Sequence, residues 1–491
     1  MTIPRLSLAV AFGLLSVPAL AQPVRQVTTQ DYRQQAQAEL ARLKADQPVT
    51  GPARNVIIFI GDGMGVSSLT ASRIYQGQKL GKDGESFVTA MDSLSHTALV
   101  KTYTHDAQVA DSAPTATAIM SGVKARNDVV GVGPETELGK CEGPDAHAVP
   151  SIFDFAQKSG RATGIISTAR ITHATPAATY AHTPNRDWES DGDVPAQAGK
   201  AGCTDIARQM IEGRVGAGMD LILGGGRANF LPAGQKDPEY ADRTGKRKDG
   251  RDLVAAWRKK NPRGAYVYDA RGFVQITPQT PKVLGLFEPD HMQYEAERGN
   301  EPSLADMTRA AIRMLGSRDK GYVLLVEGGR IDHAHHAGNA RRSLEDTVAL
   351  DGAIRAALDM VDLKDTLVLV TADHSHTLTI NGYPARGNPI LGLAADEKGV
   401  PFKAKDGKPY TTLSYANGGG ATVDAPRADP ALTDTTALDY RQQSLVPLAS
   451  ETHGGEDVVV RASGPMAHLF KGTIEQHTIY HVVREALQPG G

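Results

Sequence analysis

The sequence predicts an α/β fold, a three-layer sandwich in which helices cover both faces of a central, largely parallel sheet. Short apolar runs alternate with helical patterns, which is typical of parallel strands buried on both faces. Glycine is plentiful, with 51 residues, and aromatic residues make up only 5% of the chain, as expected for an α/β protein with many tight turns. The apolar runs lie at 56–60, 164–166, 221–223, 323–326 and 367–370.

Residues 1–21 have the pattern of a secretory signal peptide. Arg5 supplies a positive charge, residues 6–15 an apolar core, and residues 19–21 an A-x-A cleavage site. The apolar core is too short to span a bilayer, and no other stretch is long enough, so no transmembrane segment is expected. We therefore expect the mature chain to begin near Gln22 and to be periplasmic or secreted.

Residues 22–50 are expected to form an N-terminal arm that contains one helix, over 28–46. Thr28 and Asp31 resemble a capping box. One apolar stripe follows the helix and comprises Tyr32, Ala36, Leu40 and Leu43. The stripe would pack either on a partner subunit or on the chain's own domain.

The α/β domain is expected to comprise residues 51–384 and 446–491. Helical patterns occur at 152–158, 303–315 and 343–361, and the last strand is predicted at 458–460. Residues 385–445, rich in Gly, Pro, Asp and Ala, interrupt the alternation and predict an inserted loop-rich subdomain.

Composition excludes some classes of partner. The formal net charge is -3, and no basic block indicates binding to nucleic acid or to an anionic membrane surface. Only two cysteines occur, Cys141 and Cys203. In an exported protein this even count favours one disulfide, and two free buried thiols are the alternative.

The stretch 322–338 carries the clearest chemical signal. An apolar strand ends at Glu327, and Asp332 and His336 follow with a spacing of four. On a helical turn both would face the same way, as two ligands of one zinc ion must, whereas Glu327 suits a harder ion such as magnesium. The alternative is a polar, solvated helix start.

Three acids follow three strands: Asp62, Glu327 and Asp373. Ligands of such sheets gather beyond the carboxyl ends of the strands, where these acids would repel one another unless cations neutralise them. His374 follows Asp373 directly, and His453 lies on a late turn, so both are candidate imidazole ligands. The glycines around Asp62 do not have the spacing of a dinucleotide-binding loop.

Ser112 is the candidate nucleophile. Residues 111–118 read as a helix start with Pro114 in the first turn. The helix dipole favours an alkoxide there, and zinc coordination would favour it further. Plain N-capping is the alternative.

Together these segments resemble the alkaline phosphatase family of metal-dependent phosphomonoesterases. The match covers residues 55–483 and is closer to the animal-type enzymes than to the best-known bacterial form. It is strongest at 180–188, 223–227, 326–336 and 371–376.

The resemblance implies a set of ligands. A first zinc would be held by Asp332, His336 and His453. A second would be held by Asp62, Asp373 and His374 and would bind the Ser112 oxygen. Magnesium would be held by Asp62, Thr175 and Glu327. His173, His333 and His376 would lie beside these ligands without holding a metal.

The resemblance also implies further features. Arg186 would clamp phosphate oxygens by bidentate hydrogen bonds, and Cys141 would pair with Cys203. The chain would be a homodimer, with residues 385–445 as its crown-like interface subdomain. A calcium site would comprise Glu239, Phe287, Glu288 and Glu301, although Glu301 replaces the family's aspartate.

The implied function is hydrolysis of small phosphate monoesters at alkaline pH through a phosphoserine on Ser112, with two zinc ions, one magnesium ion and a possible calcium ion. The alternatives are a phosphodiesterase of the same superfamily and a non-catalytic periplasmic phosphate or metal binder. A sulfatase is disfavoured, because the sulfatase signature requires arginine at the position that Ala116 occupies.

Overall fold

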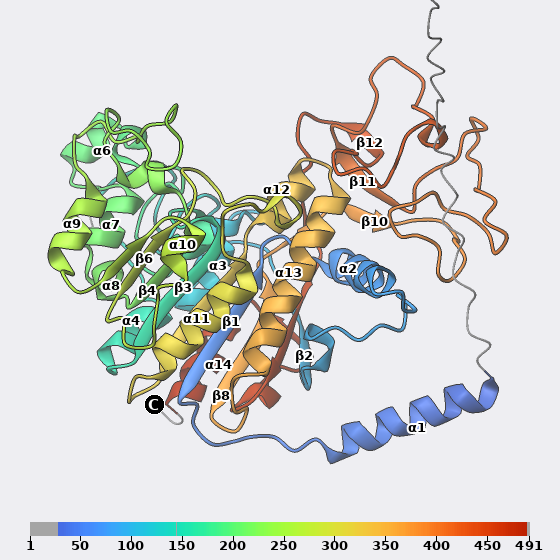
Figure 1. The fold of residues 1–491 in the computed structure, drawn as a ribbon, viewed down its shortest axis with the longest axis horizontal. Coiled ribbons are helices and arrows are strands. Elements are labelled where there is room, and N and C mark those ends of the chain that lie inside the picture. Colours follow the sequence, from blue (N-terminus) through green and yellow to red (C-terminus); the bar gives the residue numbers. More distant parts are fainter. Residues whose placement is uncertain (1–27, 144, 489–491) are drawn as a thin grey trace, which may run out of the picture.

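The computed structural model describes residues 28–143 and 145–488, so the signal peptide predicted for residues 1–21 lies outside the described residues. Its main feature is a ten-stranded sheet with the order β15-β2-β14-β8-β1-β7-β3-β4-β6-β5 (Figure 1). The strands of this sheet are β1 (Asn55–Gly61), β2 (His96–Lys101), β3 (Ala162–Arg170), β4 (Leu221–Gly225), β5 (Ala265–Val267), β6 (Val283–Leu286), β7 (Tyr322–Gly328), β8 (Thr366–Ala372), β14 (Val458–Ser463) and β15 (Thr473–Glu475).

The sheet confirms the predicted fold class. Strand β14 runs antiparallel to β8 and β2, and the other pairings in the sheet are parallel. One detail of the prediction is wrong, since β14 is not the last strand. Strand β15 follows it, but β15 is three residues long and pairs only with β2, so its sequence carries too little periodicity to predict a strand.

Helices cover both faces of the sheet. Helices α11 and α13 contact each other on one face, and α14 contacts α3 and α4 on the other. The helices are α1 (Thr29–Ala45), α2 (Val66–Lys79), α3 (Ser112–Ser121), α4 (Ile152–Lys158), α5 (Ala174–Ala177), α6 (Ala196–Lys200), α7 (Ile206–Glu212), α8 (Arg214–Gly218), α9 (Leu253–Lys260), α10 (Ala270–Phe273), α11 (Leu304–Gly316), α12 (Arg330–His336), α13 (Ala340–Leu358) and α14 (Thr478–Leu487). None of the described helices is long and apolar enough to cross a membrane.

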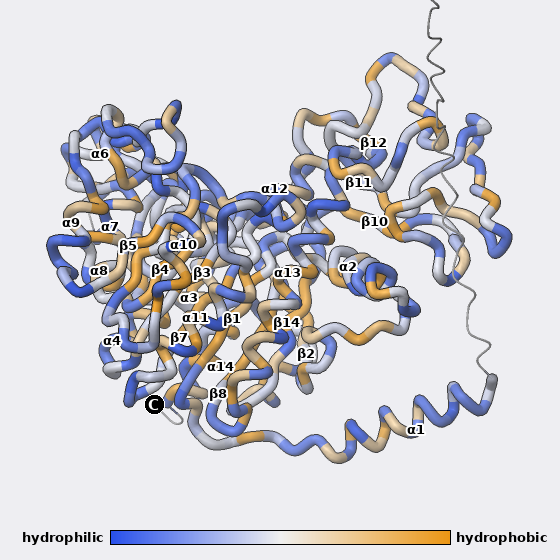
Figure 2. The backbone as a smooth tube through the Cα atoms, in the orientation of Figure 1, coloured by the Kyte–Doolittle hydropathy of each residue, from blue (hydrophilic) through white to orange (hydrophobic). Residues whose placement is uncertain are grey.

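The core lies between these layers. In Figure 2 the hydrophobic residues gather on the strands of the large sheet, and β7 and β8 are buried along their whole length. Helix α13 begins three residues earlier than predicted, because the Asn339 side chain accepts a hydrogen bond from the Arg342 backbone and caps the helix.

Two smaller sheets lie outside the main one. Strands β10 (Leu378–Ile380), β11 (Leu413–Gly418) and β12 (Ser444–Pro447) form a three-stranded sheet that joins the loop-rich part to residues on either side of it. Strand β9 (Ser375–His376) pairs with β13 (His453–Gly454), with His453 opposite His376. This short pairing brings a residue from beyond the loop-rich part to the end of β8.

The arm helix α1 forms as predicted, with a capping box between Thr28 and Asp31. The helix extends away from the main body (Figure 1), and each of its residues is exposed. Tyr32, Leu40 and Leu43 are each about half exposed. The apolar stripe therefore does not pack on the chain's own domain.

Candidate active site

The site begins where three neighbouring strands end. Strand β1 lies between β8 and β7, and these strands deliver Asp62, Asp373 and Glu327 to one edge of the sheet. All three carboxylates are fully buried. Burial, followed by repulsion from Asp373 and Asp332, raises the pKa of Asp62 well above its ordinary value. Burial also raises the pKa of Asp373 to about 6 and that of Glu327 to about 7. A positive charge at this edge would offset both the burial of the carboxylates and their mutual repulsion.

Ser112 is the first residue of α3 and lies beside these acids. Its Oγ is 2.9 Å from His374 Nε2 and 3.4 Å from Asp62 Oδ1. His374 Nε2 also lies 3.4 Å from carboxylate oxygens of Asp62 and Asp373. These three residues can hold one metal ion, and the serine hydroxyl points at the same place. The N-cap of the helix is Asp111, whose carboxylate accepts from the Ala113 backbone, so Ser112 does not cap it.

A second group contains Asp332, His336 and His453. Nδ1 of His336 lies 2.6 Å from the Glu451 carbonyl, and Nδ1 of His453 lies 2.7 Å from the Ala110 carbonyl. A carbonyl only accepts, so each Nδ1 carries a proton and, in the neutral ring, each Nε2 is left with a lone pair. The two Nε2 atoms lie 3.0 Å apart, and Asp332 Oδ1 is 3.4 and 3.3 Å from them. Two lone pairs and a carboxylate at these distances suit a shared cation such as zinc.

His376 belongs to the second group, and its ring lies between two carboxylates. Its Nδ1 is 2.6 Å from Glu451 Oε2, and its Nε2 is 2.8 Å from Asp332 Oδ1. Although burial opposes the charge, hydrogen bonds to the two carboxylates raise the pKa of His376 to about 9. A protonated ring has no lone pair to offer, so we expect His376 to orient Asp332 by donating to it.

The two metal-capable groups adjoin each other. The rings of His374 and His453 are stacked, with centroids 3.7 Å apart. Hydroxyl, imidazole and carboxylate groups thus converge on two neighbouring positions.

A third set of candidate ligands consists of oxygen atoms alone. Asp62 Oδ2, Glu327 Oε1 and Thr175 Oγ1 are buried and lack a hydrogen-bond partner among the described residues. Unpartnered buried oxygens are costly, and a hard cation would satisfy them. The rings of His173 and His333 are 5.4 Å apart, and both are neutral because burial lowers the pKa of each.

Arg186 supplies the positive charge beside Ser112. One guanidinium nitrogen donates to Asp111 Oδ1, and the other lies 2.8 Å from His173 Nε2. The Asp111 and Asp62 carboxylates raise the pKa of Arg186 despite its burial. A buried, permanently charged guanidinium next to the nucleophile suits a phosphate dianion.

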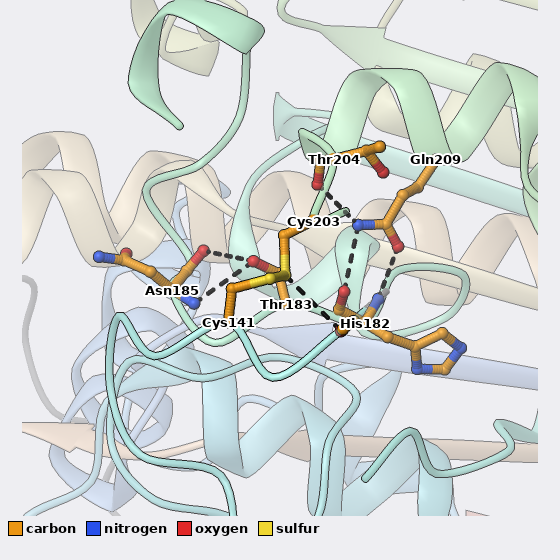
Figure 3. The surroundings of a disulfide bond; sticks show 8 residues. Cys141, His182, Thr183, Asn185, Cys203, Thr204 and Gln209 are labelled. Carbon is orange, nitrogen blue, oxygen red and sulfur yellow. Dashed lines mark hydrogen bonds between the residues drawn. A yellow bond between two sulfur atoms is a disulfide. The ribbon is translucent and has the colours of Figure 1, made fainter. Parts of the chain in front are cut away.

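Cys141 and Cys203 form a disulfide with an S–S distance of 2.01 Å, which confirms the predicted pairing. Figure 3 shows it beside Thr183 and Asn185, in the segment that leads to Arg186.

Among the residues of the expected calcium site, Glu288 and Glu301 interact with each other. Glu239 pairs with Arg227 at 2.8 Å, and Tyr240 donates to Glu288 at 2.6 Å. Phe287 is fully buried after β6.

Three residues at the site were missed by the sequence analysis. Asp111, next to Ser112, could have been found as the helix cap. Glu451 lies two residues before His453, but its contact with His376 depends on the β9–β13 pairing. The sequence assigns no role to His291, whose ring lies 4.0 Å from that of His333. No local pattern predicts that contact.

The fold and the site define a class, the α/β enzymes in which a serine hydroxyl faces metal-ligand groups at the carboxyl edge of a parallel sheet. Comparison with known proteins gives the family. The family model "Alkaline phosphatase" matches residues 53–489. The chain is 45% identical over 475 residues to the tissue-nonspecific alkaline phosphatase of Gallus gallus, which covers 94% of this chain and 90% of the relative. It is 43% identical over 490 residues to the Homo sapiens enzyme, covering 98% and 92%.

Solved structures agree on the fold. An alkaline phosphatase from an Antarctic bacterium superposes with a TM-score of 0.62 at 24% identity, covering 89% of this chain and 99% of that one. A variant of it, with a histidine replaced by aspartate and Mg bound in the M3 site, gives 0.61 at 25% identity over the same shares of the two chains. The chain belongs to the alkaline phosphatase family, close to its animal-type members. It is a metal-dependent phosphoric monoester hydrolase, as the resemblance implied.

Proposed function

We propose that this phosphomonoesterase works through a phosphoserine on Ser112, with two zinc ions and one magnesium ion. Asp332, His336 and His453 would hold the first zinc, and Asp62, Asp373 and His374 the second. Asp62, Thr175 and Glu327 would hold magnesium. The observation that carries this proposal is that the Nε2 atoms of His336 and His453 lie 3.0 Å apart beside Asp332. The nitrogen-containing groups suit zinc, and the all-oxygen set suits magnesium.

The chain's own residues then perform two displacements. When bound, the cations supply Lewis-acid charge that favours the serine alkoxide and stabilises the leaving oxygen. Arg186 orients the phosphoryl group by hydrogen bonds to its oxygens. Ser112 Oγ attacks phosphorus as the ester P–O bond breaks, and the alcohol leaves with a proton. Water then attacks the phosphoserine, which releases inorganic phosphate and restores the Ser112 hydroxyl.

The magnesium assignment has support from a relative. The Antarctic enzyme holds Mg in its M3 site when a histidine is replaced by aspartate. In this chain two neutral histidines, His173 and His333, lie together near Arg186, so histidines are expected to weaken magnesium binding here.

The remaining assignments concern assembly and location. We infer that the chain forms a homodimer, because α1 and the crown-like part expose apolar side chains, among them Leu40, Leu432 and Leu445. Light scattering on the purified chain tests this. The disulfide and the pattern of residues 1–21 support a periplasmic or secreted location, which cell fractionation tests. Calcium at Glu239, Phe287, Glu288 and Glu301 would have to compete with Arg227.

One assay tests substrate class and metals together. After chelation, zinc and magnesium should restore nitrophenol release from nitrophenyl phosphate. Release from bis-nitrophenyl phosphate should be much slower, because Arg186 suits a dianion. Faster turnover of the diester would make the chain a phosphodiesterase.

A further inference from the structure

Arg186 lies in an irregular segment. Residues 184–188 belong to no helix or strand, and Thr183 forms only an isolated bridge with Val130. Backbone bonds on one side hold the segment: the Gly139 N–H donates to the Pro184 carbonyl at 2.8 Å, and the Arg186 N–H donates to the Asp128 carbonyl at 2.7 Å. The position of the guanidinium therefore depends on what holds the other side.

On the other side, the Ile206 backbone N–H donates to the Trp188 carbonyl at 2.8 Å, and His182, ahead of Thr183, is held by Gln209 on α7. Its Oε1 accepts from the His182 backbone N–H at 2.8 Å, and its Nε2 donates to the His182 carbonyl at 3.1 Å. The same Nε2 donates to the Thr204 carbonyl at 3.0 Å. As Figure 3 shows, the amide pairs with both polar groups of one backbone residue, as a neighbouring strand would. The disulfide at Cys203 fastens the chain just before Thr204.

We propose that Gln209 is a positioning residue for phosphate binding, which it influences by fixing the segment that carries Arg186. The inference rests on the proposed role of Arg186. Gln209 touches neither Ser112 nor the metal-ligand groups in any described contact, so its effect should appear in phosphate affinity and not in metal content. A backbone segment that is free to shift would cost Arg186 part of its alignment with the phosphoryl oxygens.

The test compares Gln209→Met with wild type. Methionine keeps the length of the side chain and removes all three hydrogen bonds. We expect the inhibition constant of inorganic phosphate to rise roughly three- to tenfold, the scale of one or two neutral hydrogen bonds, with unchanged zinc content. Gln157→Met is the matched control, because Gln157 also donates twice, to Thr163 Oγ1 at 3.0 Å and to the Val215 carbonyl at 2.9 Å. It should leave the inhibition constant unchanged.

A double variant separates positioning from general loosening. In an Arg186→Ala background, Gln209→Met should have no further effect on phosphate inhibition, since the group it positions is gone. Equal effects in both backgrounds would overturn the inference. If Arg186→Ala alone leaves phosphate binding unchanged, the proposed role of Arg186 is wrong. If Arg186→Ala weakens phosphate binding and Gln209→Met does not, only the positioning role of Gln209 is wrong. Should Gln209→Met not fold, Gln209→Glu keeps the acceptor, loses both donor bonds and gives the same comparison.

Discussion

Two regions of the molecule bury several acids, and they neutralise them differently. At the active site, Asp62, Glu327 and Asp373 are fully buried, and two of them keep an oxygen without a partner. In the other region, which we call the arginine-paired cluster (Arg227, Asp237 and Glu239), the fully buried Arg227 donates to both oxygens of Asp237 at 2.8 and 2.7 Å.

The difference shows what each region is for. Where the chain supplies its own cation, Arg227 forms ion pairs with both Asp237 and Glu239, and we expect the result to be structural. Where it withholds one, oxygens and imidazole lone pairs are left facing one another, and only an added cation completes the site. The arginine-paired cluster therefore should contribute to stability, and the active site to turnover.

Ser112→Ala should have the largest effect. The hydroxyl is the only part of the side chain that faces His374 and Asp62, so turnover should fall by roughly 10³-fold or more, with stability unchanged. Water can still attack directly, so activity need not vanish. Ser121→Ala, at the other end of α3, is the control and should retain normal turnover of nitrophenyl phosphate. Near wild-type turnover in Ser112→Ala would refute the covalent route.

Arg227→Met should lower stability and leave turnover unchanged, the opposite of Ser112→Ala. It leaves Asp237 and Glu239 without their cation, and breaking a buried pair costs about 3–5 kcal/mol. Denaturant unfolding measures this loss, while zinc content and turnover of the folded fraction stay normal. Arg42→Met removes an exposed pair with Glu39 and should leave the free energy of unfolding almost unchanged. If Arg227→Met is equally mild, the cluster is not held by its arginine.

The double change His173→Asp with His333→Lys should tighten magnesium binding by roughly tenfold or more. Aspartate adds negative charge and accepts hydrogen bonds from magnesium's waters, which neutral imidazoles do not. Wild-type enzyme purified without magnesium should activate slowly when magnesium is added, and excess zinc should inhibit it reversibly. Calorimetry gives the affinity. Stoichiometric magnesium that survives exhaustive dialysis of the wild type would show that the histidines do not weaken the site.

These contrasts also show what could be predicted from sequence. The apolar runs fix the parallel strands, and parallel strands end at one edge, so the meeting of Asp62, Glu327 and Asp373 follows from local patterns. The contacts of Glu451, His291 and Gln209 do not, because each depends on how distant segments pack. Nor could the sequence distinguish the acids that an arginine satisfies from those that need a metal. Arg227 lies 10 residues from Asp237, and no sequence pattern between them predicts their pairing.

Glu301→Gln should have the smallest effect, and it depends on pH. Burial, with a further contribution from Glu288, raises the pKa of Glu301 to about 8 from its ordinary value of 4.5. The folded protein therefore holds a proton that the unfolded chain releases between these two pH values. This contribution to stability is fully present below pH 4.5 and is lost as the pH rises through 8. Glutamine does not titrate, so the variant should keep its stability across this range.

The measurement is the free energy of unfolding at pH 5 and pH 8.5, with and without calcium. The free energy of unfolding of the wild type minus that of Glu301→Gln should fall by about 1 kcal/mol or more from pH 5 to pH 8.5. Calcium bound at Glu301 would replace the proton in the wild type, so the difference between the two proteins would no longer fall with pH. A fall that calcium leaves unaltered would show that calcium does not bind at Glu301. A difference that does not vary with pH would mean that Glu301 is ionised in the folded protein and that a cation other than its own proton already neutralises it.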